Sequence, residues 1–315
     1  MSGSTDAAFR RQAVRFGAPA VVSEMVAGEA LARSRPDMVR RTCRHEGKGR
    51  WIVQLAARRP EDMRLGAQLL VDAGVDQIDI NMGCPSRQVT GGASGSALMK
   101  EPDLARSIID AALEGGQGTP VSLKMRLGWD HEMLNAPELA RQAERAGVVM
   151  ITVHGRTRCQ FYKGVADWRR IADSVNAVSV PVIANGDISG IDDARTALTE
   201  SGAYGVMIGR NAMGQPWLLG QVAAELEGRA YTQPDERTQL DSLLSQIEDS
   251  QSLYGSELGL RIVRKHISAA IDKLDRPWGE TARRAARSHA CQMENAPALI
   301  NFLTDVFLEN REVAA

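Results

Sequence analysis

The 315-residue chain has little of several features that would mark other protein classes. Its four cysteines, Cys43, Cys84, Cys159 and Cys291, lie far apart and form no CxxC pair, which argues against a disulfide framework and a zinc site. No apolar run approaches the roughly 18–20 residues of a membrane span. The first residues, MSGSTDAAFRR, contain no apolar signal segment. We therefore expect a cytoplasmic protein with no membrane association and no metal.

The net charge of −1 hides an uneven distribution of charge along the chain. Residues 1–60 hold twelve Lys/Arg against five Asp/Glu, and residues 261–287 hold eight against three. A polyanionic partner such as a nucleic acid requires basic patches of this kind. Solvated helix faces would explain the same charges, so charge alone leaves both interpretations open.

Short apolar runs alternate with amphipathic segments over the first two thirds of the chain. The strand candidates are residues 19–25, 51–56, 77–82, 120–126, 149–154, 180–184 and 205–208. This alternation predicts βα units around a parallel sheet that is covered on both faces. The expected fold class is an α/β protein built on a (β/α)8 TIM barrel. Because only seven strands are visible, we expect the first strand to be truncated at the N-terminus.

The barrel pattern stops near Leu226, and helical patterns follow. The apolar stripes are Leu240, Leu243, Leu244 and Ile247; Leu260, Val263, Ile267, Ile271 and Leu274; and Leu299, Phe302, Leu303, Val306 and Phe307. Spacings of three and four residues predict amphipathic helices. We therefore expect a barrel domain at residues 1–227, a linker at 228–238 and a small all-helical C-terminal domain at 239–315.

Polar residues close nearly every predicted strand, and in TIM barrels the C-terminal strand ends carry the working residues. These residues are Gln54, Asn81 with Cys84, Lys124, His154 with Arg156, Asn185-Gly186-Asp187, and Gly209-Arg210. Glycine beside a polar residue after the last two strands lets backbone N–H groups approach a phosphate. Arg210 could bind the same phosphate through two hydrogen bonds. A phosphate-bearing cofactor is therefore expected at this end of the barrel.

The individual side chains suit a ring cofactor. Lys124 could stabilise an anionic form of the ring, and the Gln54 amide could bind an imide edge. His154 is either structural or in contact with cofactor or substrate. The Cys84 thiol could act as a general acid, although a buried structural cysteine is the better explanation of Cys84 taken by itself.

The chain resembles the tRNA-dihydrouridine synthases, most closely the bacterial B-type group. The matching stretches are MSGSTDAAFRR, VVSEMV, VQLAARRPEDM, DINMGCPSRQVT, SLKMRLGW, VHGRTRCQFYKGVADW, VIANGDI, VMIGRNAMGQPWL and RIVRKH. They occur in the family's order from residue 1 to about residue 266. NMGCP together with HGRTR.Q.Y.G is highly specific to this family.

The resemblance implies reduction of the C5–C6 double bond of selected uridines in tRNA by an FMN-bound TIM barrel. NADPH would reduce FMN, hydride would pass from flavin N5 to C6, and Cys84 would protonate C5. The implied cofactor-binding residues are Met1, Ser2, Gln54, Lys124, His154, Asn185, Gly186, Asp187, Gly209 and Arg210. The implied substrate-binding residues are Asn81 and Arg156 in the barrel, and Arg261, Arg264, Lys265, Arg283, Arg284 and Arg287 in the helical domain. We expect a monomer that binds tRNA.

Two other functions stay open on the sequence. One is a flavin barrel that reduces a free pyrimidine, which would need neither the basic patches nor the helical tail. The other is a non-enzymatic tRNA-binding or regulatory protein on the same fold. A protein of that kind would have no need of Cys84, Lys124 and Arg210.

Overall fold

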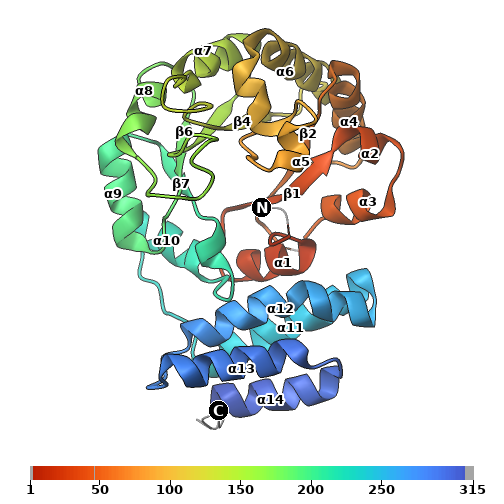
Figure 1. Cartoon of the computed structure of the whole chain (residues 1–315), viewed down its shortest axis with the longest axis vertical. Coiled ribbons are helices and arrows are strands. Elements are labelled where there is room, and N and C mark those ends of the chain that lie inside the picture. Colours follow the sequence, from red (N-terminus) through yellow and green to blue (C-terminus); the bar gives the residue numbers. More distant parts are fainter. Residues whose placement is uncertain (1–2, 46, 309–315) are drawn as a thin grey trace. The chain divides into compact units, whose positions relative to one another are not determined.

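A computed structural model describes residues 3–45 and 47–308 of the chain. Its seven parallel strands form one sheet, in which each strand pairs with the next along the chain. The strands are β1 (Ala20–Ala27), β2 (Arg50–Ala56), β3 (Gln77–Met82), β4 (Val121–Arg126), β5 (Met150–His154), β6 (Val182–Asn185) and β7 (Gly205–Met207). Figure 1 shows the sheet curled inside a ring of helices. The predicted TIM-barrel-like α/β fold is confirmed, and all seven predicted strands are present.

Helices connect the strands, and most of them lie around the outside of the sheet (Figure 1). They are α2 (Gly28–Ala32), α3 (Pro36–Thr42), α4 (Pro60–Asp72), α5 (Arg87–Thr90), α6 (Pro102–Gly116), α7 (Ala136–Ala146), α8 (Ala172–Val175) and α9 (Ile191–Ser201). Proline occupies the first turn of α3, α4, α6 and α7, where its missing N–H costs no hydrogen bond. Helices α4 and α6 approach so closely that a Cβ at Gly115 would lie 2.2 Å from the Arg64 carbonyl oxygen.

The parallel register brings the polar strand ends level with one another. Gln54 on β2 pairs with Asp79 on β3, and Asn81 on β3 pairs with Lys124 on β4. His154 on β5 pairs with Asn185 on β6. The apolar residues between them are inaccessible to solvent, including Ile78, Ile80 and Met82. The sheet therefore collects side chains that are far apart in sequence at its carboxyl edge.

The backbone contacts divide the described chain into two compact units. The first unit comprises Ala20–Arg44 and Gly49–Gly209. The second comprises Gly3–Pro19, the short stretch around Lys48, and residues 210–308. Its helices are α1 (Ala7–Arg15), α10 (Leu218–Leu226), α11 (Glu236–Tyr254), α12 (Ser256–Lys273), α13 (Glu280–Gln292) and α14 (Ala296–Leu308). Across the described residues, we find no helix with the length and apolar character needed to cross a membrane.

The core of the second unit is made by the apolar stripes on the helical segments. Leu243, Ile267, Ala290 and Leu303 come from α11, α12, α13 and α14 and lie together in one buried cluster. Burial of this kind stabilises a fold by about 25 cal/mol for each Å² of apolar surface removed from water. The amphipathic helices predicted from these stripes are therefore present.

Helices α1 and α10 belong to the second unit by their contacts, although the sequence pattern places both in the barrel domain. The Gln12 side chain on α1 donates to Ser245 Oγ and accepts from Ser242 Oγ, both on α11. The Phe9 ring stacks on His266 with centroids 5.1 Å apart. The domain limits 1–227 and 239–315 stay a prediction.

Candidate functional site at the carboxyl edge of the sheet

Cys84 lies just beyond β3, and hydrogen bonds hold its backbone on both sides. The N–H groups of Gly83 and Cys84 donate to Asn81 Oδ1 at 3.2 and 3.0 Å. The Cys84 carbonyl accepts from the N–H and the hydroxyl of Ser96, at 3.1 and 2.8 Å. Gly95 has φ +60°, and a Cβ there would lie 3.2 Å from that of Cys84. Hydrogen bonds therefore fix the position of the backbone that carries the thiol.

A chain of buried polar groups continues inward from Asn81. Asn81 Nδ2 donates to Gln54 Oε1 at 2.7 Å, and Gln54 Nε2 donates to Asp79 Oδ2 at 2.6 Å. Asp79 Oδ1 accepts from the Ser122 hydroxyl at 2.7 Å. Burial raises the pKa of Asp79, while the hydrogen bonds from Gln54 and Ser122 and the charge of Lys124 act against that rise.

Two cations from β4 lie near Cys84. Lys124 Nζ donates to Asn185 Oδ1 at 2.8 Å, and burial lowers the pKa of Lys124 to about 8, with the charge of Arg126 adding to the effect. Arg126 is 1% exposed and donates to the Gly83 carbonyl at 2.8 Å. Both cations interact electrostatically with Cys84. Cys84 therefore lies within the electrostatic reach of two positively charged side chains.

The loops after β5 and β6 are joined by an ion pair. Arg156, 3% exposed, donates to Asp187 Oδ1 and Oδ2 at 2.8 and 2.6 Å. Its guanidinium also donates to the carbonyls of Lys163 and Gly164. Gly186 has φ +119°, and a Cβ there would lie 2.9 Å from the His154 ring. Only glycine permits this approach without strain.

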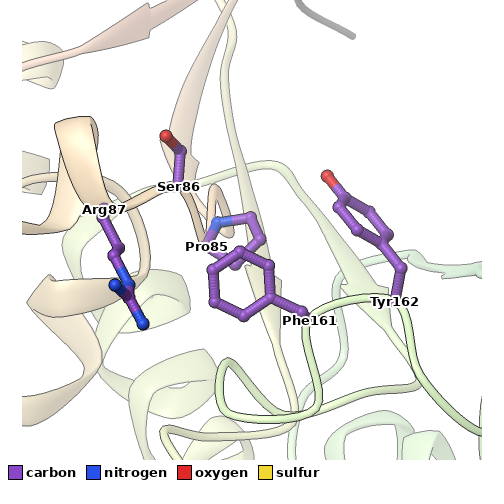
Figure 2. Close-up of a pocket in the computed structure, with 5 residues that line it drawn as sticks. All are labelled: Pro85, Ser86, Arg87, Phe161 and Tyr162. Atoms are coloured by element: carbon purple, nitrogen blue, oxygen red, sulfur yellow. The ribbon is translucent and has the colours of Figure 1, made fainter.

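A pocket of about 400 Å³ opens at the residues that follow Cys84 in the chain. Its walls are Pro85, Ser86, Arg87, Phe161 and Tyr162. Figure 2 shows the two aromatic rings rising from the loop after β5 across from residues 85–87. Phe161 has φ 54°, a conformation that is uncommon for a residue other than glycine. The pocket therefore combines aromatic faces with a cationic side chain.

Buried Arg126 links the two walls of this pocket. Its Nε donates to the Gly83 carbonyl, and its Nη1 donates to the Phe161 carbonyl at 2.9 Å. Its guanidinium also lies 5.7 Å from the centroid of the Tyr162 ring. The Arg126 side chain thus holds the Cys84 segment and the aromatic loop to one another.

Comparison with known proteins identifies the family. The dihydrouridine synthase family model matches residues 1–306. The chain is 46% identical to a probable tRNA-dihydrouridine synthase of Rhodobacter capsulatus, over all of this chain and 94% of the relative. It is 45% identical to a protein of the same name from Rickettsia bellii, over 85% of this chain and 82% of the relative. The chain belongs to the dihydrouridine synthase family. A tRNA-dihydrouridine synthase B of Shewanella oneidensis is 37% identical over 98% of this chain and 95% of the relative, in line with the resemblance to the B-type group.

The structure brings together most of the barrel residues that the family resemblance implies. Gln54, Asn81 and Cys84 are joined by hydrogen bonds, as are Lys124 and Asn185. Gly186 lies against His154. Arg156 and Asp187 pair with each other, although the resemblance assigns them to substrate and cofactor respectively. The cofactor roles of all these residues stay predictions.

Other implied residues are differently placed. Met1 and Ser2 lie outside the described residues. Gly209 ends the first unit, and exposed Arg210 begins the second. Nothing in the geometry bears on a phosphate site at these two residues, so that site stays a prediction.

The six basic residues implied to bind tRNA in dihydrouridine synthases fall into two groups. Arg261 and Arg284 are exposed. The other four are at most half-exposed, and three have contacts within the second unit: Arg264 donates to the Met293 carbonyl, Arg287 pairs with Asp272 and Glu280, and Arg283 donates to carbonyls at the end of α12. Lys265 is half-buried on α12.

Several residues of the site are absent from the set inferred from the sequence. Asp79 and Ser122 lie inside apolar strands, where nothing in the local pattern marks them as functional. Phe161 and Tyr162 lie on an irregular loop. The signal that could have found Asp79 is its own charge, since a carboxylate within a fully buried strand requires partners.

Proposed function

We propose that this dihydrouridine synthase reduces the C5–C6 double bond of specific uridines in tRNA, with FMN as its cofactor and NADPH as the electron donor. The observation that carries the proposal is the placement of Cys84. Its backbone is fixed at the carboxyl edge of the sheet, next to two cations and a pocket with aromatic walls. The carboxyl edge is where TIM-barrel enzymes have their active sites.

The residues at this edge fit a flavin. The backbone at Gly186 packs directly against the His154 ring, which fixes that ring at the carboxyl edge where the flavin would be held. Lys124 offers a poorly solvated ammonium group, which would favour an electron-rich ring edge. Gln54, Lys124, His154, Asn185 and Gly186 would hold the flavin. When reduced by NADPH, FMN would supply the hydride that C6 of the uridine accepts.

Cys84 would complete the reduction as general acid. Its thiol proton would pass to C5, so that the carbon–carbon double bond becomes a single bond once C6 has received hydride. The thiolate left behind would face the charges of Lys124 and Arg126, and solvent would return the proton. Asn81 fixes the backbone of Cys84 and so determines where the proton is delivered.

The pocket lined by Phe161 and Tyr162 would receive bases of the tRNA. A base must leave the stack before its C5 and C6 atoms can be reached inside a protein. Aromatic side chains stack on unpaired bases, and a cation such as Arg87 suits the adjoining phosphate. This pocket, which lies beside the proposed proton donor, favours a base within RNA over a free pyrimidine.

The direct test uses purified protein, FMN, NADPH and unmodified tRNA, with dihydrouridine measured by mass spectrometry. Cys84→Ala should lower the rate by at least about a hundredfold, which is the lower range of what general acid catalysis contributes. Cys159→Ala is the matched control, because Cys159 is exposed. Full activity of Cys84→Ala with FMN still bound would show that the acid role is wrong.

A further inference from the structure

A series of hydrogen bonds connects Asp79, in the middle of β3, to the backbone of Cys84, and all of them run from donor to acceptor in the same direction. Donors and acceptors alternate along Asp79, Gln54, Asn81 and the N–H groups of Gly83 and Cys84. A primary amide can be turned over in place, which exchanges its oxygen with its nitrogen. The direction of two amides in series is therefore set only by what lies at the two ends.

The groups at both ends of this series of hydrogen bonds allow only one orientation of the two amides. The N–H groups of Gly83 and Cys84 are donors only, so they require the oxygen of Asn81. Asp79 Oδ2 is an acceptor, so it requires the nitrogen of Gln54. If Asp79 holds a proton on Oδ1, that proton can be donated to Ser122, and Oδ2 still accepts. The orientation of both amides is thus the same when Asp79 is ionised and when its proton is on Oδ1.

We propose that Asp79 is a positioning residue for Cys84, acting through the orientation of the Gln54 and Asn81 amides. Asp79 holds the Gln54 nitrogen, so the Gln54 oxygen is available to the Asn81 nitrogen, and the Asn81 oxygen is turned toward the backbone of Cys84. Asp79 is 2% exposed, and Gln54 and Asn81 are 6% and 8% exposed. Water therefore competes poorly for these groups, and a wrongly turned amide would leave buried donors facing one another.

This series of hydrogen bonds, which we call the relay, gives a role to the Asp79 carboxyl group, whose burial otherwise destabilises the fold. A carboxylate in a buried strand is retained only against a desolvation penalty. Asp79 lies in β3, five residues before Cys84, and its own side chain makes its hydrogen bonds to β2 and β4. The inference deepens the proposed function, because it concerns the placement of the residue that would donate the proton.

The first test measures the Cys84 backbone without using catalysis. Amide hydrogen exchange at Gly83 and Cys84 is measured on the full chain, together with the rate at which iodoacetamide alkylates Cys84. Asp79→Ala should speed both processes by about tenfold, since a lost buried hydrogen bond is worth about that factor. Asp76→Ala is the control, because Asp76 accepts from the Trp51 N–H at the opposite end of β3; it should leave both rates within about twofold of the native protein. Native-like rates in Asp79→Ala would overturn the proposal.

A second test keeps the branched shape of the buried Asp79 side chain and examines its role as an acceptor. Asp79→Asn still offers an oxygen to Gln54 Nε2 and should leave exchange at Cys84 within about twofold of the native protein. Asp79→Leu has a similar branched shape but offers no acceptor, so it should speed exchange by about tenfold. Equal exchange rates in Asp79→Asn and Asp79→Leu would overturn the proposal. A role in packing alone predicts that equality.

The activity of Asp79→Ala separates this inference from the proposed function. With an active enzyme we expect kcat for tRNA to fall by about tenfold with KM little changed, because the tRNA contacts are untouched. If the native protein makes no dihydrouridine while Asp79→Ala still loosens the Cys84 amide, the relay stands and the proposed function fails. If activity is present and neither the amides nor kcat respond, the relay fails alone.

Discussion

Arg156 Nη1 and Nη2 donate to the two carboxylate oxygens of Asp187, at 2.8 and 2.6 Å, and so join the loops that follow β5 and β6. Arg156 is almost fully buried, whereas the Asp187 side chain is 31% exposed. Asp187 also accepts from the N–H of Ala166 at 2.7 Å. The ion pair between these two side chains therefore holds the loop after β5 to the loop after β6 at the edge of the site.

Breaking this ion pair from the carboxylate side should destabilise the protein. Asp187→Ala leaves a buried guanidinium without its anion, and we expect a loss of about 2 kcal/mol, below the usual range for a fully buried pair because Asp187 is partly exposed. Thermal denaturation measures the change. Asp167→Ala is a suitable control, since the Asp167 pair with Arg170 is largely exposed. Equal effects of the two substitutions would contradict a special role for the Arg156 pair.

The pKa of Lys124 predicts an alkaline limit to activity. Burial lowers the pKa of Lys124 to about 8, so the ammonium group is charged below that pH and neutral above it. If the charge supports reduction, the rate should fall as pH rises through about 8. Lys124→Arg should move this fall to higher pH, because a guanidinium keeps its proton. A rate that is level from pH 7 to pH 9 in the native protein would contradict the role of the charge.

The lowered pKa of Lys124 predicts that stability rises with pH, in contrast to the activity, which falls. Between pH 8 and the ordinary lysine value of 10.5, the unfolded chain holds a proton that folded Lys124 has released. The free energy of unfolding contributed by this group therefore increases as pH rises through that window. Lys124→Met should remove this increase, and it should lower activity most below pH 8, where the native side chain is charged. Urea denaturation between pH 7.5 and pH 10 provides the measurement.

His266 predicts a loss of stability in acid. Burial lowers the pKa of His266 to about 3, the charge of Lys265 adds to the effect, and the Ser4 backbone opposes it. Below pH 6.5, His266 binds a proton in the unfolded chain, whereas in the folded chain it binds one only near pH 3. Stability present above pH 6.5 is therefore lost as pH falls, by about 2 kcal/mol at pH 5. His266→Phe should weaken this dependence, whereas the exposed His131→Gln should leave it intact.

Neighbouring arginines on α13 should differ in what they do. Arg284 is exposed, and Arg283 donates to the carbonyls of Ile271, Leu274 and Arg276. If the helical unit binds tRNA, Arg284→Ala should weaken binding and reduce its salt dependence by about one phosphate contact. Arg283→Ala should instead lower thermal stability by removing a cap from the end of α12. Binding titrations at several salt concentrations, with denaturation of both variants, separate the two effects.

The fold was largely predictable because the strands are mainly apolar and the connecting segments are amphipathic. The site was partly predictable for the same reason, since parallel strands of known limits bring Gln54, Asn81 and Lys124 to one edge. The pairing of Arg156 with Asp187 was not, because no local period links residues 31 positions apart. The association of α1 with α11 and α12 depends on Gln12 and Phe9, whose partners lie more than two hundred residues away.

Asp79 illustrates why the remainder of the site required coordinates. In sequence it is a polar residue within a strand, and its neighbours suggest only burial. Its role depends on hydrogen bonds with Gln54 from β2 and Ser122 from β4, which come next to Asp79 only after the sheet forms. The aromatic pocket likewise depends on two loops held together by Arg126.

The central claim is that Cys84 donates a proton to specific uridines of tRNA. Site-resolved mapping of dihydrouridine in tRNA from cells that lack this protein tests it most directly, with the native gene, Cys84→Ala or Cys159→Ala returned on a plasmid. The account predicts that particular positions lose dihydrouridine, and that the native protein and Cys159→Ala restore them while Cys84→Ala does not. An unchanged map in cells without the protein, or full restoration by Cys84→Ala, would contradict it.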